Sequence, residues 1–167
     1  LLAYAVDDKG SELHTIHFRD IATGEDLADA IPDTRGMAWS RDGRTLFYVR
    51  LDDNHRPMSV WRHHVGTDAG EDVLVYHEPD TGFYVGLEQT HSGRYILIDT
   101  HDHQTNEVRL IDAEQPLAPP VLIEPRQTGH EYAVEHHGER RRIRRDHELV
   151  TQAALQPEAR DAKGLVL

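Results

Sequence analysis

Short apolar runs separated by polar turns recur along the chain at nearly regular intervals. In two segments, Ser40–Tyr48 and Thr90–Leu97, a polar turn that contains glycine is followed by an apolar run rich in β-forming residues. A weaker copy of the same turn lies at 136–140. The glycines of the three copies are 50 and 45 residues apart: Gly43, Gly93 and Gly138. This period is typical of a unit of four strands, which repeats roughly every 40 to 50 residues.

The turn residues themselves predict hairpins. Glycine adopts a positive φ at no steric cost, so Asp-Gly between two apolar runs is a strong signal for a tight turn. Asp42-Gly43 has this form, and Ser92-Gly93 is a weaker version of it. Apolar residues precede each turn, and the runs 46–49 and 95–98 follow. Each repeat therefore opens with two antiparallel strands.

Two further strands complete each repeat. We expect third strands at 60–65 and 107–112, and fourth strands at 73–76 and 121–123. The loops between them carry proline, glycine and aspartate, as turns require. Two complete units of four strands thus occupy 35–80 and 81–126.

The ends of the chain match parts of the same unit. Leu2–Val6 and Leu13–Asp20 resemble the second and third strands, so 1–34 is a partial blade. The apolar pattern is lost after Gly138, which indicates a partial, degraded blade at 127–152 and an irregular or short helical tail at 153–167. The prediction is an all-β fragment of a β-propeller, with two complete four-stranded blades and a partial blade at each end. An open β-sandwich with frequent hairpins is the alternative.

The order of these segments is similar to that of a known family over residues 1 to about 138. The carrying segments are Leu2–Asp7, Thr45–Arg50, Asn54–Pro57, Val60–His63, Asp72–Tyr76, Ser92–Ile96, Glu107–Asp112 and Glu131–His136. They resemble the propeller of oligopeptidase B-like serine peptidases (protease II), in the prolyl oligopeptidase family. The resemblance implies a seven-bladed parent propeller above an α/β-hydrolase domain with a Ser/Asp/His triad. It also implies that the propeller admits only short peptides, and that cleavage follows Lys or Arg.

No catalytic residue can be taken from this resemblance, because the hydrolase domain is not in the chain. A nucleophile elbow needs Gly-x-Ser-x-Gly. None of the serines has glycine two residues away on both sides: Ser11, Ser40, Ser59 and Ser92. We expect a non-catalytic chain without cofactor, whose partners are the missing hydrolase domain, the remaining blades and short peptides. A stand-alone propeller scaffold and a histidine-rich, periplasmic-type metal-binding β protein are the competing hypotheses.

Charge and composition argue against nucleic acid and membranes as partners of this chain. The net charge of −12 repels phosphate backbones, which makes nucleic acid a poor partner. No run approaches the roughly 18 apolar residues of a membrane span. The absence of cysteine fits a reducing compartment, so we expect the cytoplasm, with the periplasm as the alternative. An open arc of blades leaves apolar faces uncovered, so we expect the isolated chain to self-associate.

Three clusters suggest chemistry and have simpler explanations. His101 and His103 would point to the same side of an extended chain as a candidate metal pair, but solvated loop histidines are the favoured interpretation. The arginines at 140–145 could form a basic patch, yet pairing with acids or a frayed terminus is favoured. Five acids could line a cavity that attracts basic peptides, or could simply solvate the surface: Asp52, Asp53, Glu78, Asp80 and Glu88. Trp39 and Trp61 are expected to pack in the core between blades.

Overall fold

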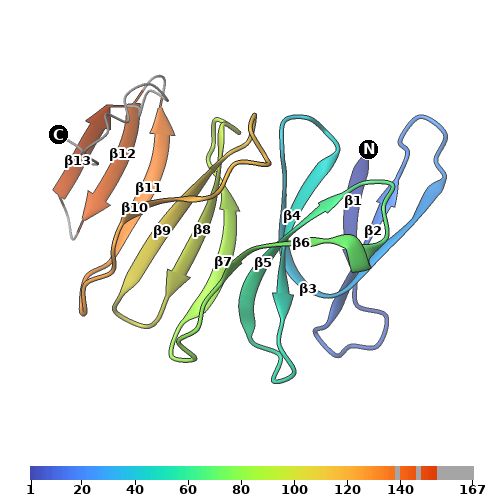
Figure 1. The fold of residues 1–167 in the computed structure, drawn as a ribbon, viewed down its shortest axis with the longest axis horizontal. Coiled ribbons are helices and arrows are strands. Elements are labelled where there is room, and N and C mark those ends of the chain that lie inside the picture. Colours follow the sequence, from blue (N-terminus) through green and yellow to red (C-terminus); the bar gives the residue numbers. More distant parts are fainter. Residues whose placement is uncertain (138–139, 146–147, 154–167) are drawn as a thin grey trace.

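Strands make up nearly all of the regular secondary structure in the computed structural model, which describes residues 1–137, 140–145 and 148–153 (Figure 1). The strands are β1 (Leu2–Val6), β2 (His14–Arg19), β3 (Asp26–Trp39), β4 (Thr45–Leu51), β5 (Pro57–His64), β6 (Val73–His77), β7 (Tyr84–Gln89), β8 (Tyr95–His101), β9 (Asn106–Asp112), β10 (Val121–Glu124), β11 (Tyr132–His137), β12 (Arg140–Arg145) and β13 (Glu148–Ala153). One short 3₁₀ turn, η1 (Ala69–Glu71), interrupts the strands between β5 and β6.

The strands form consecutive antiparallel sheets in chain order. β1 to β6 make one sheet, β7 to β10 a second, and β11 to β13 a third. The six-stranded sheet holds two blades, because β3 pairs with β2 through its first half and with β4 through its second half. The predicted all-β propeller fragment is therefore confirmed, with β3–β6 and β7–β10 as the two complete blades and partial blades on either side (Figure 1).

A bend inside β3 joins the first blade to the second. Asp33 and Gly36 have φ values of 55° and 67°, and the register with β4 shifts between Arg35 and Met37. The left-handed backbone turns the chain from the last strand of one blade into the first strand of the next (Figure 1). The predicted boundary between residues 34 and 35 thus falls inside a strand rather than in a loop.

The predicted glycine turns are confirmed. Gly43 and Gly93 have φ values of 67° and 66°, and each turn connects the first two strands of a blade. Asp42 stabilises its turn, because its carboxylate accepts hydrogen bonds from the Thr45 hydroxyl at 2.7 Å and from the Arg44 and Thr45 amides at 2.8 Å. Burial alone would raise the pKa of Asp42, but these bonds and one from the Ser40 hydroxyl lower it to about 2.

Apolar side chains fill the spaces between neighbouring blades. Ile16, Phe18 and Ile31 from the first blade meet Leu46 and Tyr48 from the second. A second cluster joins the second and third blades, and a third cluster, which includes Leu97, Val108 and Tyr132, joins the third and fourth. Trp39 and Trp61 pack against the first of these clusters as partly buried side chains.

The C-terminal part of the chain keeps more blade structure than its sequence pattern suggests. The arginine-rich segment forms β12, which pairs in register with β11 on one side and with β13 on the other. Strand pairing uses backbone groups, so a run of arginines does not prevent it. Gly138 and the predicted tail after Ala153 lie outside the described residues.

Candidate functional site

The first strand of each blade lies against its neighbour. β7 contacts β3, β4 and β5 of the preceding blade, and β11 contacts β9. In a closed propeller such first strands surround the central channel. The loops at the two ends of these strands therefore form the two rims of the arc.

An acidic cavity of about 280 Å³ lies on the rim at the bend of β3. Its lining consists of Leu13, Asp33, Leu51, Asp52, Asp53 and His55. The β4–β5 turn positions three of these residues, because the Asp52 carboxylate accepts from the Asn54 amide at 2.9 Å and the Arg56 amide at 2.8 Å. Asp33 and Asp53 are exposed, so their negative charges face solvent at the mouth of the cavity.

The cavity brings together only part of the acidic set proposed from the sequence. Asp52 and Asp53 lie in it, whereas Asp80 accepts from the Gly82 amide in the β6–β7 loop and Glu88 is exposed on β7. Sequence reasoning missed Asp33. A polar residue at the junction of two repeats was the available signal, since a bend in the backbone turns such a residue outward.

Glu78 differs from the other acids because its side chain is only 1% exposed. Its carboxylate accepts from Tyr76 Oη at 2.6 Å, from the Asp80 amide at 2.8 Å, and from Arg126 Nη1 and Nη2 at 3.1 and 3.2 Å. Burial alone would raise the pKa of Glu78, but the bonds from Tyr76 and Arg126 hold it below its ordinary value. The ion pair between Glu78 and Arg126 joins the loop before the third blade to the loop before the fourth.

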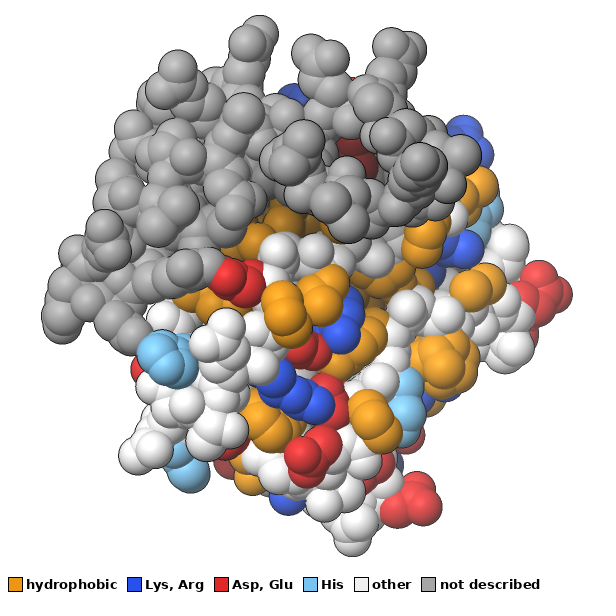
Figure 2. All heavy atoms as spheres, turned by 60° about the vertical axis from the view of Figure 1, so that its left-hand side comes forward, with side chains coloured by type: hydrophobic (Ala, Val, Ile, Leu, Met, Phe, Trp, Pro, Cys, Tyr) orange, Lys and Arg blue, Asp and Glu red, His pale blue; other side chains and the backbone are white. Residues whose placement is uncertain are grey.

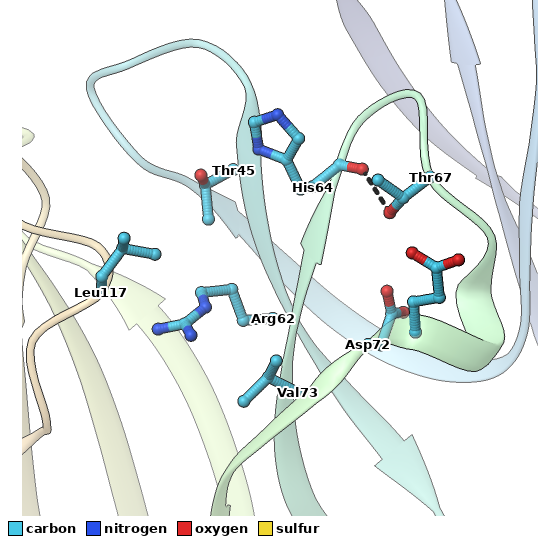
Figure 3. Close-up of a pocket in the computed structure, with 8 residues that line it drawn as sticks. Thr45, Arg62, His64, Thr67, Asp72, Val73 and Leu117 are labelled. Atoms are coloured by element: carbon cyan, nitrogen blue, oxygen red, sulfur yellow. Dashed lines mark hydrogen bonds between the residues drawn. The ribbon is translucent and has the colours of Figure 1, made fainter.

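A second cavity, of about 230 Å³, lies on the opposite rim between the second and third blades (Figure 3). Arg62 of β5 reaches across it, and its Nη1 donates to the Pro116 carbonyl at 2.8 Å in the loop that also carries Leu117. Thr45, the first residue of β4, donates its hydroxyl hydrogen to Asp42 Oδ2 at 2.7 Å. The lining includes a basic residue, Arg62, and two acidic ones, Glu71 and Asp72, so it could bind charged groups of either sign. No serine lines this cavity.

One serine and histidine pair occurs elsewhere. Ser92 Oγ lies 2.7 Å from His136 Nδ1. The same hydroxyl oxygen accepts from the Arg94 amide at 3.2 Å and lies 3.1 Å from Thr90 Oγ1, so it is part of the β7–β8 turn. Among residues 1–136, no carboxylate hydrogen-bonds the ring of His136 to complete a triad.

The two candidate metal-ligating histidines lie in different local settings. His101 is the last residue of β8 rather than a loop residue, because its pairing with Asn106 extends the strand beyond the apolar run. Its Nδ1 lies 3.0 Å from Asp99 Oδ2, and its ring approaches Tyr84, whereas His103 is exposed in the following turn. Among the residues that the structure describes, no group of three or more His, Asp or Glu side chains is placed to hold a metal ion.

Exposed apolar side chains gather at the sheet edges. Figure 2 shows hydrophobic side chains open to solvent beside charged ones on the face toward the fourth blade. β1, β6 and β10 end their sheets and carry exposed residues that are 39 to 49% accessible: Leu2, Val6, Val73, Leu74, Val121 and Leu122. No helix in the described segments has the length and apolar character needed to cross a bilayer.

Comparisons with known proteins agree with this architecture. The model of the prolyl oligopeptidase N-terminal beta-propeller domain matches residues 1–162. The chain is 36% identical to Protease 2 of Moraxella lacunata over 138 residues, which cover 81% of this chain and 20% of that protein. It is 39% identical to Dipeptidyl aminopeptidase BI of Pseudoxanthomonas mexicana over 146 residues, which cover 86% and 20%. The chain thus spans about a fifth of the length of these relatives.

Solved structures give the same result in three dimensions. Oligopeptidase B from Leishmania major matches with a TM-score of 0.83 and 30% identity, over 93% of this chain and 23% of that one. Oligopeptidase B from Trypanosoma brucei, with covalently bound antipain, matches with a TM-score of 0.80 and 28% identity, over 90% and 22%. The chain belongs to the prolyl oligopeptidase family, as part of its N-terminal β-propeller domain.

Proposed function

We propose that this chain forms part of the propeller that limits peptide access to a hydrolase domain outside it, in an oligopeptidase B-like serine peptidase. The carrying observation is the continuous arc of blades whose first strands, β3, β7 and β11, lie against the neighbouring blade. The chain contains no Gly-x-Ser-x-Gly, so the hydrolytic chemistry belongs to another domain. Its own contribution is selection of the peptides that pass.

Charge supports selection of basic peptides. The acidic cavity places Asp33, Asp52 and Asp53 on one rim, and the whole chain carries a net charge of −12. A site lined by charges of one sign raises the local concentration of ligands of the opposite sign and speeds their association. Short peptides that contain Lys or Arg are therefore the proposed substrates of the complete enzyme.

The test uses a complete peptidase in which this chain replaces the matching propeller segment of Protease 2. We expect the chimera to cleave a short Arg-containing peptide and to leave the same sequence uncut inside a long, folded protein. Equal cleavage of both substrates would contradict the proposed restriction of access. The isolated chain, assayed in parallel, should cleave neither substrate.

A second experiment tests the charge. Replacing Asp33 and Asp53 with asparagine in the chimera should lower kcat/KM for an Arg-containing peptide several-fold at low salt, with a smaller effect at high salt because ions screen exposed charges. Asp8→Asn, in an exposed loop of the first blade, is the matched control. An equal loss for a neutral peptide, or for the control variant, would exclude electrostatic selection by this cavity.

The alternative function is a stand-alone propeller scaffold for protein interaction. The exposed apolar residues on β6 and β10 favour it, since such residues are common in binding surfaces. The complete reading frame separates the two hypotheses. Further blades followed by a nucleophile elbow, an Asp and a His would exclude the scaffold.

A further inference from the structure

An arginine with a free hydrogen-bonding edge lines the cavity between the second and third blades. Arg62 Nη1 donates to the Pro116 carbonyl at 2.8 Å, which holds the guanidinium in place. Among the described residues, no acceptor bonds Arg62 Nε or Nη2, and neither atom is fully buried. These two atoms form one edge of the guanidinium, and their parallel N–H groups match the two oxygens of a carboxylate. Arg62 therefore offers a carboxylate-binding edge that the fold itself does not use.

The acids of the same cavity leave the charge of Arg62 unpaired. The described part of the chain gives Arg62 no ion-pair partner, although Asp72 and Glu71 also line the cavity. Asp72 Oδ1 lies 2.7 Å from His63 Nδ1, and Asp72 Oδ2 accepts from Tyr48 Oη at 2.8 Å. The Asp72 side chain is only 1% exposed, whereas Glu71 is exposed to solvent. The positive charge of Arg62 is thus available to a ligand.

Apolar side chains lie on either side of this guanidinium. Val73 is the cross-strand partner of Arg62, so the two side chains share one face of the sheet. Leu117 comes from the loop between β9 and β10, and Figure 3 shows Arg62 on the Leu117 side of the cavity, with Asp72 and Thr67 on the other side. Val73 is 47% exposed and Leu117 is 76% exposed. A ligand that carries an apolar group next to a carboxylate would cover both side chains.

The loop that carries Leu117 is well ordered by its own bonds and prolines. Residues 116–120 include three prolines, whose rings restrict the backbone. The Ala118 amide donates to the Gln115 carbonyl at 3.0 Å, and the Gln115 amide donates to the Asp112 carbonyl at 2.9 Å. Ordering this loop on binding therefore costs little free energy, which favours recognition of a small ligand.

The size of the cavity limits the ligand to about one residue. Sites that enclose a whole drug-sized molecule measure roughly 300–1,000 Å³. This cavity measures about 230 Å³. Within a peptide, a carboxylate next to an apolar side chain on the same residue occurs only at the C-terminus. The cavity therefore fits the end of a peptide chain and not an internal segment.

We propose that Arg62, Val73 and Leu117 form a binding site for the free C-terminal carboxylate of a short peptide whose last residue is apolar. The choice of a peptide as the ligand rests on the proposed function. Arg62 Nε and Nη2 donate to the two carboxylate oxygens, while Val73 and Leu117 cover the last side chain. The site lies on β5, β6 and the neighbouring loop, on the opposite rim from the acidic cavity, so it holds a chain end and does not select basic side chains.

The test compares two peptides that differ only at the C-terminus. Acetyl-Ala-Ala-Leu with a free carboxylate, and the same peptide as the amide, are titrated against the full chain. Saturation-transfer NMR detects the peptide, so it tolerates self-association of the chain. We expect the amide to bind at least about tenfold more weakly, because it cannot form the charge-assisted pair of hydrogen bonds. Equal affinities, or no saturable binding of the free acid, would overturn the proposal.

A matched pair of arginine variants locates the carboxylate. Arg62→Gln should remove the preference for the free acid. Arg35→Gln should keep it, because Arg35 is an exposed arginine of β3 outside this cavity. A preference that survives Arg62→Gln would place the carboxylate elsewhere and refute the assignment. If Arg62→Gln does not fold, the comparison of acid and amide on the wild type still decides.

A second pair of variants tests the apolar wall without disturbing the core. Leu117→Ser should weaken binding of the leucine peptide several-fold and leave acetyl-Ala-Ala-Gly unchanged, because glycine has no side chain to cover. Ile21→Ser is the control, since Ile21 is 68% exposed in a loop of the first blade. It should change neither affinity. Leucine binding that is insensitive to Leu117→Ser would contradict the proposed wall.

These measurements fail separately from those of the proposed function. Restricted cleavage by the chimera without binding of the free acid would remove this site and leave the proposed function standing. Binding of the free acid, together with equal cleavage of short and long substrates, would have the opposite meaning.

Discussion

The buried Glu78–Arg126 pair yields a quantitative prediction for Glu78→Gln. The carboxylate receives four hydrogen bonds, two of them from one guanidinium, and its side chain is almost fully buried. Breaking a buried ion pair costs about 3–5 kcal/mol. The Arg126 side chain is 28% exposed and water can solvate it in part, so we expect glutamine to lower the free energy of unfolding by about 2–3 kcal/mol.

The assay is urea unfolding of the chain, followed by the fluorescence of Trp39 and Trp61. Glu114→Gln is the matched control, because Glu114 also pairs with arginines but its side chain is 48% exposed. Exposed pairs contribute less than about 1 kcal/mol. A Glu78→Gln effect no larger than that of Glu114→Gln would refute the reasoning.

The pH dependence of the Glu78 effect has a defined sign. The folded pKa of Glu78 lies below its ordinary value of 4.5. The ionised form is thus favoured by folding, and its stabilisation is present above pH 4.5 and lost as the pH falls through the folded value. The difference between wild type and Glu78→Gln should therefore shrink below pH 4.5, and a difference that grows there would contradict the assignment.

Three further predictions concern the turns, the fourth blade and association. Gly43→Ala should cost about 1 kcal/mol or more in urea unfolding because its φ is +67°, whereas Gly86→Ala should be milder, since its new Cβ would meet backbone only at 3.6 Å. Tyr132→Phe should lower the free energy of unfolding by about 1–3 kcal/mol, because the hydroxyl donates to the Glu124 carbonyl and accepts from the Val108 amide. Burial raises the pKa of Tyr132 to about 12, so the variant should also lose a late step in the ultraviolet titration of tyrosine. In analytical ultracentrifugation the isolated chain should form oligomers whose size increases with concentration. A monomer at all concentrations would show that its exposed apolar surfaces do not drive self-association.

The sequence predicted what depends on neighbouring residues. Asp42-Gly43 predicted a turn because aspartate and glycine satisfy its hydrogen bonds and its φ locally. The apolar runs 46–49 and 95–98 predicted strands because they are rich in β-forming residues, and the structure buries them almost continuously. The strand at 140–145 was underestimated, since its pairing with β11 and β13 comes from backbone groups that the side-chain pattern does not reveal.

The polar contacts between blades could not be predicted in the same way. Asp29 and His63 are 34 residues apart, and Glu78 and Arg126 are 48 apart. Residues at such distances meet only after the strands have paired, so no local pattern joins them. The second distance is close to one repeat, and an acid and a base at matching positions of successive repeats is the signal that could have revealed this pair.

The shared strand β3 also has a consequence for how the molecule can be cut. Between the second and third blades, and between the third and fourth, the chain passes through loops at 78–83 and 125–131, where a protease could enter without breaking a strand. Between the first and second blades there is no such loop, because β3 runs through the junction and pairs first with β2 and then, from Thr34 onward, with β4. Limited proteolysis should therefore release the first two blades as one fragment. For the same reason, a gene rearrangement that adds or removes a single blade should be tolerated at the later junctions and not at this one.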